Sequence, residues 1–78
     1  MYRVNIKHFF MVEYIENEKV MNVEVDLREP IVQIGIICIH SWNSPNENIV
    51  LTQQEKYDIA QNIKEYLEIK RGMRCEIV

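Results

Sequence analysis

The strongest constraint on this chain is a helix signal that begins after Thr52. Thr52 and Glu55 have the spacing of a capping box, in which the hydroxyl and the carboxylate each accept a hydrogen bond from the other residue's backbone N–H. Apolar residues then recur every three or four positions, and together they predict one apolar stripe: Tyr57, Ile59, Ala60, Ile63, Tyr66 and Leu67. A helix with one such stripe needs a partner surface to bury it.

The end of this helix is equally well marked. Lys70 and Arg71 are cations in the expected last turn, where they suit the helix dipole. Gly72 follows and is able to adopt the left-handed conformation that ends many helices. We therefore predict an α-helix over Gln53–Arg71.

Before the helix, two alternating segments predict a β-hairpin. Between residues 2 and 14, apolar residues occupy one parity and polar residues the other, which is typical of a half-buried strand. The alternation fails near His8 and Phe9, where we expect a bulge or a break. Residues 16–19 are polar and turn-like, and Met21–Leu27 alternates again until Pro30 ends the strand.

The segment Ile31–Ile39 is nearly continuous in apolar, β-branched residues. This composition predicts a central strand that is buried on both faces, with Gly35 permitting a bulge or a close approach. A buried helix is the competing interpretation, but the isoleucine-rich segment is short and is bounded by Pro30 and by a loop containing Pro45.

A last strand is predicted over Met73–Ile77, where apolar and charged residues alternate. The expected order is β-β-β-α-β in a single α+β domain spanning residues 1–78. We expect an antiparallel sheet of about four strands with the helix packed on one face. A chain of 78 residues has room for one thin core.

The net charge of −3 is unevenly distributed, because residues 1–50 carry seven acidic and only four basic side chains. No Lys/Arg cluster is present, so we expect no nucleic-acid partner. Five carboxylates gather around the predicted hairpin: Glu13, Glu16, Glu18, Glu24 and Asp26. They form either a solvated face that protects a sheet edge or an acidic surface that binds a basic protein partner.

Residues that could carry chemistry are few. His40 with Ser41, or His8 with Cys38, suggests nucleophilic catalysis, but no third orienting group or oxyanion donor accompanies either pair. The His and Cys residues are scattered singly, without the paired spacing of a zinc site. We therefore predict no enzyme, no metal and no cofactor. A small enzyme stays as an alternative that requires a polar pocket near His40.

Three further residues have two interpretations each. Trp42 either packs beneath its own loop or anchors a partner, and it is retained as a candidate partner-binding residue. Cys38 and Cys75 either pair or remain reduced, and small buried thiols are the favoured interpretation.

No secretory signal or membrane span is evident, because the apolar segment near Phe9 is followed at once by Glu13. The nine residues of Ile31–Ile39 fall short of the roughly twenty that cross a bilayer. We expect a cytoplasmic protein.

The C-terminal half resembles the immunity protein 74 family of bacterial polymorphic toxin systems. The shared features are a Trp-x-x-Pro loop, a capped helix with spaced isoleucines, a glycine and an acidic last strand: His40–Pro45, Ile49–Lys56, Ile59, Ile63, Leu67, Gly72 and the closing residues. The resemblance covers about residues 36–78 and implies an antitoxin-like protein that binds and occludes a toxin domain. It implies no catalytic residues. The alternative is an interaction module that forms a homodimer, or joins a larger assembly as a subunit, through an open sheet edge.

Overall fold

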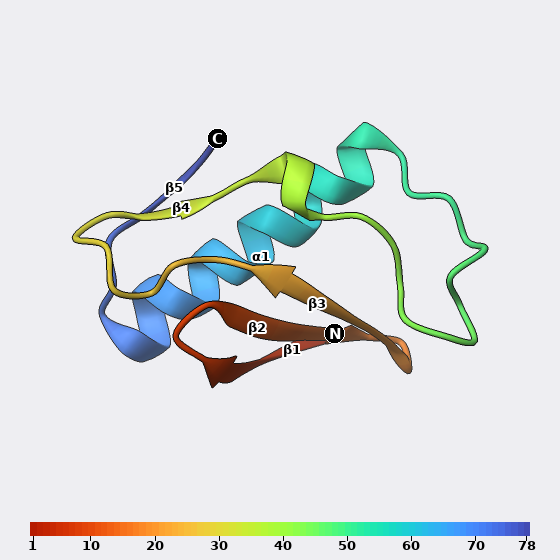
Figure 1. Ribbon diagram of the computed structural model, residues 1–78, viewed down its shortest axis with the longest axis horizontal. Coiled ribbons are helices and arrows are strands. Elements are labelled where there is room, and N and C mark those ends of the chain that lie inside the picture. The colour runs from red at the N-terminus through yellow and green to blue at the C-terminus, as the bar shows by residue number, and fades with distance from the viewer.

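A computed structural model describes residues 1–78 and confirms the α+β class, the antiparallel sheet and the single long helix (Figure 1). The elements follow in the order β1 (Tyr2–His8), β2 (Met11–Glu16), β3 (Lys19–Glu24), β4 (Val32–Ile34), the 3-10 turn η1 (Ile36–Cys38), α1 (Gln53–Arg71) and β5 (Cys75–Ile77). The strands divide into two sheets. β1, β2 and β3 form an antiparallel sheet in that order, while β4 and β5 form a separate parallel pair.

Helix α1 has the predicted bounds and the predicted caps. The Thr52 hydroxyl accepts from the Glu55 N–H at 3.1 Å, and the Glu55 carboxylate accepts from the Thr52 N–H at 2.9 Å. Gly72 has φ 65°, and across it the N–H of Met73 donates to the carbonyl of Leu67 at 3.1 Å. No helix combines the length and the hydrophobicity that crossing a bilayer requires.

The antiparallel sheet consists of two successive hairpins. Asn17 and Glu18 both have positive φ, 51° and 67°, which gives the two-residue turn that matches the twist of β2 and β3. The break expected near His8 and Phe9 is a second turn, preceded by a register shift between Ile6 and His8. The first alternating segment is therefore two strands.

The prediction of a central strand over Ile31–Ile39 is wrong. Only Val32–Ile34 is a strand, and it pairs on one side alone, with β5. After Gly35 the chain turns into η1, which leaves the side chain of Ile37 84% exposed. A strand is buried on both faces only when packed layers cover both, and in β4 Val32 and Ile34 are buried while Gln33 is exposed, so only one face is covered.

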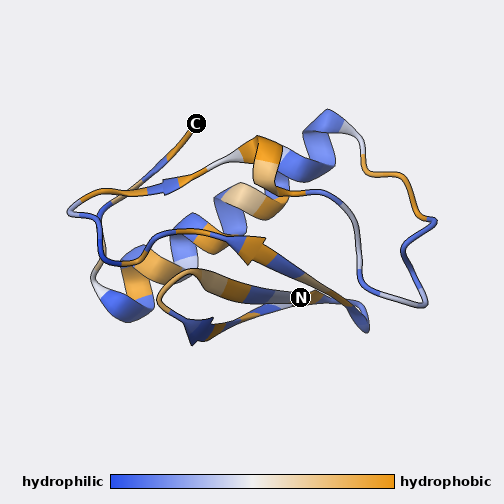
Figure 2. Ribbon diagram, viewed as in Figure 1, coloured by the Kyte–Doolittle hydropathy of each residue, from blue (hydrophilic) through white to orange (hydrophobic).

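The core lies between α1 and the two sheets, and the apolar stripe of the helix covers the antiparallel sheet as predicted. Sixteen residues are buried, and all are of hydrophobic types. Those of α1 are Ile59, Ala60, Ile63 and Leu67, and they belong to the same cluster as Val12, Tyr14, Met21 and Val23 of the sheet. Figure 2 shows hydrophobic and hydrophilic residues alternating along α1 and β3, as one-sided burial requires.

Candidate partner-binding groove

A groove of about 590 Å³ lies between the open edge of β3 and the open edge of β4. Residues 24–26 line it from the end of β3, and residues 31–38 contribute to the opposite wall. It exists because β4 pairs with β5 instead of β3, so that neither strand has a neighbour on the side facing the groove.

Several apolar side chains that line the groove are exposed to solvent. Phe10, Ile31, Ile37 and Val78 all line it, and all four are exposed. Single exposed apolar residues are common on protein surfaces, whereas a group of them in one concavity marks an interaction site.

The groove is also negatively charged. Glu24, Asp26 and Glu29 line it, and no Lys or Arg does. The backbone N–H of Arg28 donates to the Asp26 carboxylate at 3.0 Å and its Nε at 3.3 Å, and these bonds hold the pKa of Asp26 below its ordinary value. Glu24 and Glu29 are exposed and form no ion pair. Two carboxylates of the groove therefore have no ion-pair partner within the chain.

Arg28 forms no ion pair with those two carboxylates. Its guanidinium carbon lies 4.3 Å from the centre of the Phe10 ring, a cation–π contact, while its Nε binds Asp26. The Arg28–Asp26 pair is therefore an internal brace beside the groove.

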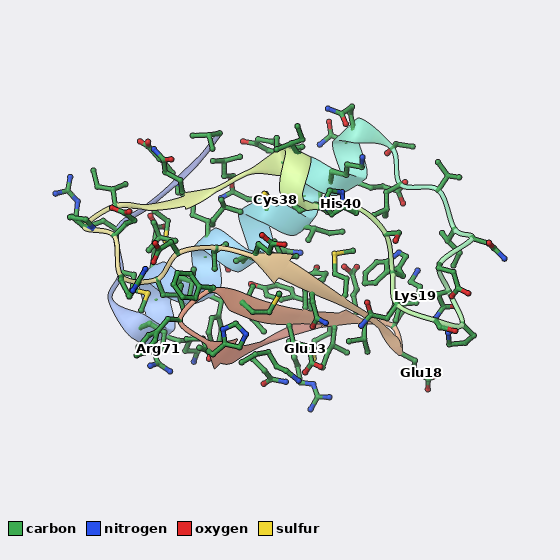
Figure 3. All side chains as sticks on the ribbon, in the orientation of Figure 1. Glu13, Glu18, Lys19, Cys38, His40 and Arg71 are labelled. Carbon is green, nitrogen blue, oxygen red and sulfur yellow. The ribbon has the colours of Figure 1, made fainter.

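The five predicted hairpin acids do not form one surface. Glu24 and Asp26 line the groove, whereas Glu13 is bound by the Asn5 amide at 3.1 Å and by Lys7 at 3.6 Å. Glu16 accepts a hydrogen bond of 2.5 Å from the Tyr14 hydroxyl. Glu18 has no side-chain partner, and Figure 3 shows it at the tip of the hairpin, with Glu13 nearer the middle.

Trp42, the sixth predicted site residue, is only 4% exposed. Its ring lies 6.1 Å from that of Tyr14, and the Lys19 ammonium is 5.1 Å from its centre. The indole Nε1 is buried without a hydrogen-bond partner. Trp42 thus packs against β2 and β3 and offers almost no surface to a partner.

The residues considered for catalysis and metal binding are not assembled into a site. Cys38 and Cys75 are both free, and burial raises the pKa of the Cys75 thiol. His40 and Ser41 are exposed and make no side-chain hydrogen bond, and Figure 3 shows His40 beside η1. No group of three or more His, Cys, Asp or Glu residues is close enough to hold a metal ion.

A second concavity, of about 390 Å³, lies between the open edge of β1 and the C-terminal half of α1. Tyr2, Val4 and Tyr66 line it together with Ile69, which is 70% exposed. Lys70 and Arg3 stand beside Glu65 here, so this groove lacks the single sign of charge seen between β3 and β4.

The sequence does not reveal the apolar members of the groove between β3 and β4, because Ile31 and Ile37 lie in a segment whose composition predicts a buried strand. Gly35 is the signal that could have found them. It lies between β4 and η1, at the point where the apolar run stops being a strand.

No family model, no curated protein and no solved structure matches this chain. The resemblance to the immunity protein 74 family therefore stays a prediction.

Proposed function

We propose that this protein is a non-enzymatic binding protein that recognises a partner protein through the groove between β3 and β4. The observation that carries this proposal is the joint presence of exposed apolar side chains and unpaired carboxylates in one concavity. Protein interfaces combine these two features, since apolar contacts supply affinity and charges supply orientation. The carboxylates also repel phosphate, which disfavours a nucleic-acid partner.

The proposed partner is a bacterial toxin domain with a basic surface segment. The resemblance to the immunity protein 74 family supports this choice, and so does the charge of the groove. A protein that neutralises a toxin by covering it needs a complementary surface and no catalytic group.

Co-expression with toxin domains encoded beside this gene tests the proposal. The wild-type protein is expected to protect the host cell. Ile37→Asp, at a position 84% exposed within the groove, is expected to weaken binding about 30-fold or more, as the loss of an interface anchor does. Val50→Asp, at a position 87% exposed in the loop before α1 and outside the groove, is the matched control and should protect as well as the wild type. Absence of protection, or equal protection by both variants, overturns the proposal.

A homodimer formed through β1 is the second candidate. It is favoured by the open edge of β1 and by Ile69, which is exposed beside that edge. Size-exclusion chromatography with light scattering distinguishes the two, because a monomer at every concentration excludes the dimer.

A further inference from the structure

We infer that the partner enters this groove as an extended strand, with alternating basic and apolar residues, that pairs with the open edge of β3. This inference rests on the proposed function and specifies the chemistry of its partner. Four observations support it.

First, the backbone of β3 has free hydrogen-bonding groups on the edge that faces away from β2, and Glu24 at the end of that edge lines the groove. The N–H of Val25 donates to the Phe10 carbonyl at 3.1 Å, so Val25 faces β2. Because backbone hydrogen bonding alternates between the two sides of an antiparallel strand, the N–H and C=O groups of Asn22 and Glu24 point away from β2. The carbonyl of Val20 shows this orientation directly, since it accepts from the N–H of Asn43 at 2.6 Å.

The bond between Asn43 and Val20 closes one end of the β3 edge. Beyond it, the backbone groups of Asn22 and Glu24 have no partner within the chain. The free edge from residue 22 to residue 26 accommodates a strand of about five residues at roughly 3.4 Å per residue.

Second, the opposite wall carries the same kind of edge. The N–H of Val32 donates to the Arg74 carbonyl at 2.8 Å, and the carbonyl of Ile34 accepts from Val78 at 3.0 Å. The backbone groups of Val32 and Ile34 are therefore bonded to β5. Because these groups alternate in direction along the strand, those of Gln33 point to the other side, toward the groove. An extended peptide between two unpaired edges gains hydrogen bonds that no other conformation offers.

Third, the side chains along the groove specify the residues of that peptide. Glu24 lies on the solvent-facing side of β3, where a Lys or Arg of a neighbouring strand forms a favourable cross-strand pair. Residues of the other parity turn toward the apolar side chains of Ile31 and Val25, so they are expected to be apolar.

Fourth, the charge of this edge disfavours a second copy of the chain as the occupant. Pairing two copies of the free edge, residues 22–26, would bring carboxylates such as Glu24 near one another, and this segment contains no Lys or Arg. The same groove attracts a basic segment from another protein.

The test uses the whole protein and a synthetic probe, a blocked seven-residue peptide of alternating lysine and valine. Its binding is followed by amide chemical shifts and hydrogen exchange. We expect salt-sensitive binding, shifts centred on the amides of Asn22, Glu24 and Gln33, and slower exchange at Asn22 and Glu24. The same peptide with glutamate in place of lysine should bind at least tenfold more weakly.

Two controls separate strand pairing from attraction between charges. A peptide N-methylated at alternate residues keeps its charge but loses backbone N–H donors. When the methylated residues are those whose N–H groups face β3, it should bind at least tenfold more weakly than the unmethylated peptide. Glu24→Lys, an exposed position, should weaken the lysine peptide and strengthen the glutamate peptide.

If the peptide methylated on the parity that faces β3 binds as tightly as the unmethylated peptide, or if no amide shifts appear at Asn22 and Glu24 at millimolar peptide, the inference is overturned. Either result leaves the proposed function standing if Ile37→Asp still abolishes protection in the co-expression assay. Loss of the proposed function is seen instead as absence of protection by the wild type.

Discussion

The side-chain amide of Asn62, on α1, donates a hydrogen bond of 2.8 Å to the hydroxyl of Tyr14, on β2. The same hydroxyl donates to the Glu16 carboxylate at 2.5 Å, so it both accepts and donates. Tyr14 is fully buried among residues of hydrophobic types, between the rings of Tyr2 and Trp42. This polar contact therefore sets the position of the helix on the sheet, which apolar packing alone leaves less well defined.

Removal of that hydroxyl is expected to destabilise the protein. Tyr14→Phe leaves the amide of Asn62 and the carboxylate of Glu16 without their partner, and we expect the free energy of unfolding to fall by about 1–3 kcal/mol. Urea denaturation measures the change. Tyr57→Phe, at a half-exposed tyrosine without a hydrogen bond, is the control and should stay within about 0.5 kcal/mol of the wild type. Equal stability of the two variants contradicts this account of Tyr14.

The raised pKa of the Tyr14 hydroxyl predicts that the protein loses stability at alkaline pH. Burial raises the pKa of Tyr14 well above its ordinary value, and the hydrogen bond to Glu16 raises it further. A tyrosine with a raised pKa in the folded state favours folding while the unfolded chain holds its proton. That contribution is complete below about pH 10 and declines as the pH rises above it.

Melting temperatures of the wild type and of Tyr14→Phe, measured from about pH 9 to pH 11, test this dependence. The difference between the two proteins should shrink as the pH rises. A constant difference means that Tyr14 titrates normally in the folded state. Tyr2, whose pKa is also raised by burial, is present in both proteins and cancels in the comparison.

The two glycines provide a test of the helix terminus. Gly72 has φ 65°, and a Cβ there meets no atom within 4 Å, so Gly72→Ala loses stability through backbone strain alone. We expect a loss of about 1–2 kcal/mol in urea denaturation. Gly35→Ala is the control. Gly35 has φ −83°, which any residue adopts, and a Cβ added there would lie 3.4 Å from the Cys38 sulfur. A loss at Gly35 as large as the loss at Gly72 is the contrary result.

Two isoleucines three residues apart, Ile34 and Ile37, distinguish the observed β4 from the strand predicted over Ile31–Ile39. Ile34 is fully buried and Ile37 is 84% exposed. Ile34→Ala is expected to lower the free energy of unfolding by about 2–5 kcal/mol. Ile37→Ala should change it by less than about 0.5 kcal/mol. Large losses in both variants would favour the longer buried strand.

Local sequence was sufficient for the helix and for the second hairpin. Thr52, Glu55 and Gly72 act on backbone groups only a few residues away, so the bounds of α1 could be predicted to the residue. The turn at Asn17 and Glu18 is likewise a local feature. The apolar stripe on α1 correctly required a sheet beneath it, and Ile59, Ile63 and Leu67 do face that sheet.

The candidate groove was only partly foreseen. Glu24 and Asp26 were predicted as partner-binding residues and line it, but sequence proximity grouped them with Glu13 and Glu16, whose carboxylates have partners within the hairpin. A carboxylate's neighbours across strands depend on register, which a list of charges does not contain.

The sequence by itself determined the α+β class, the capped helix and the hairpin, because short-range hydrogen bonding and periodicity govern them. Only the tertiary structure decided that β4 pairs in parallel with β5, a choice between segments 43 residues apart, as the contact of Gln33 with Glu76 shows. That choice leaves β3 and β4 unpaired toward each other, exposes Ile37 and opens the groove. Burial of an apolar run depends on which elements cover its two faces, and its pairing depends on distant segments, neither of which the run itself encodes.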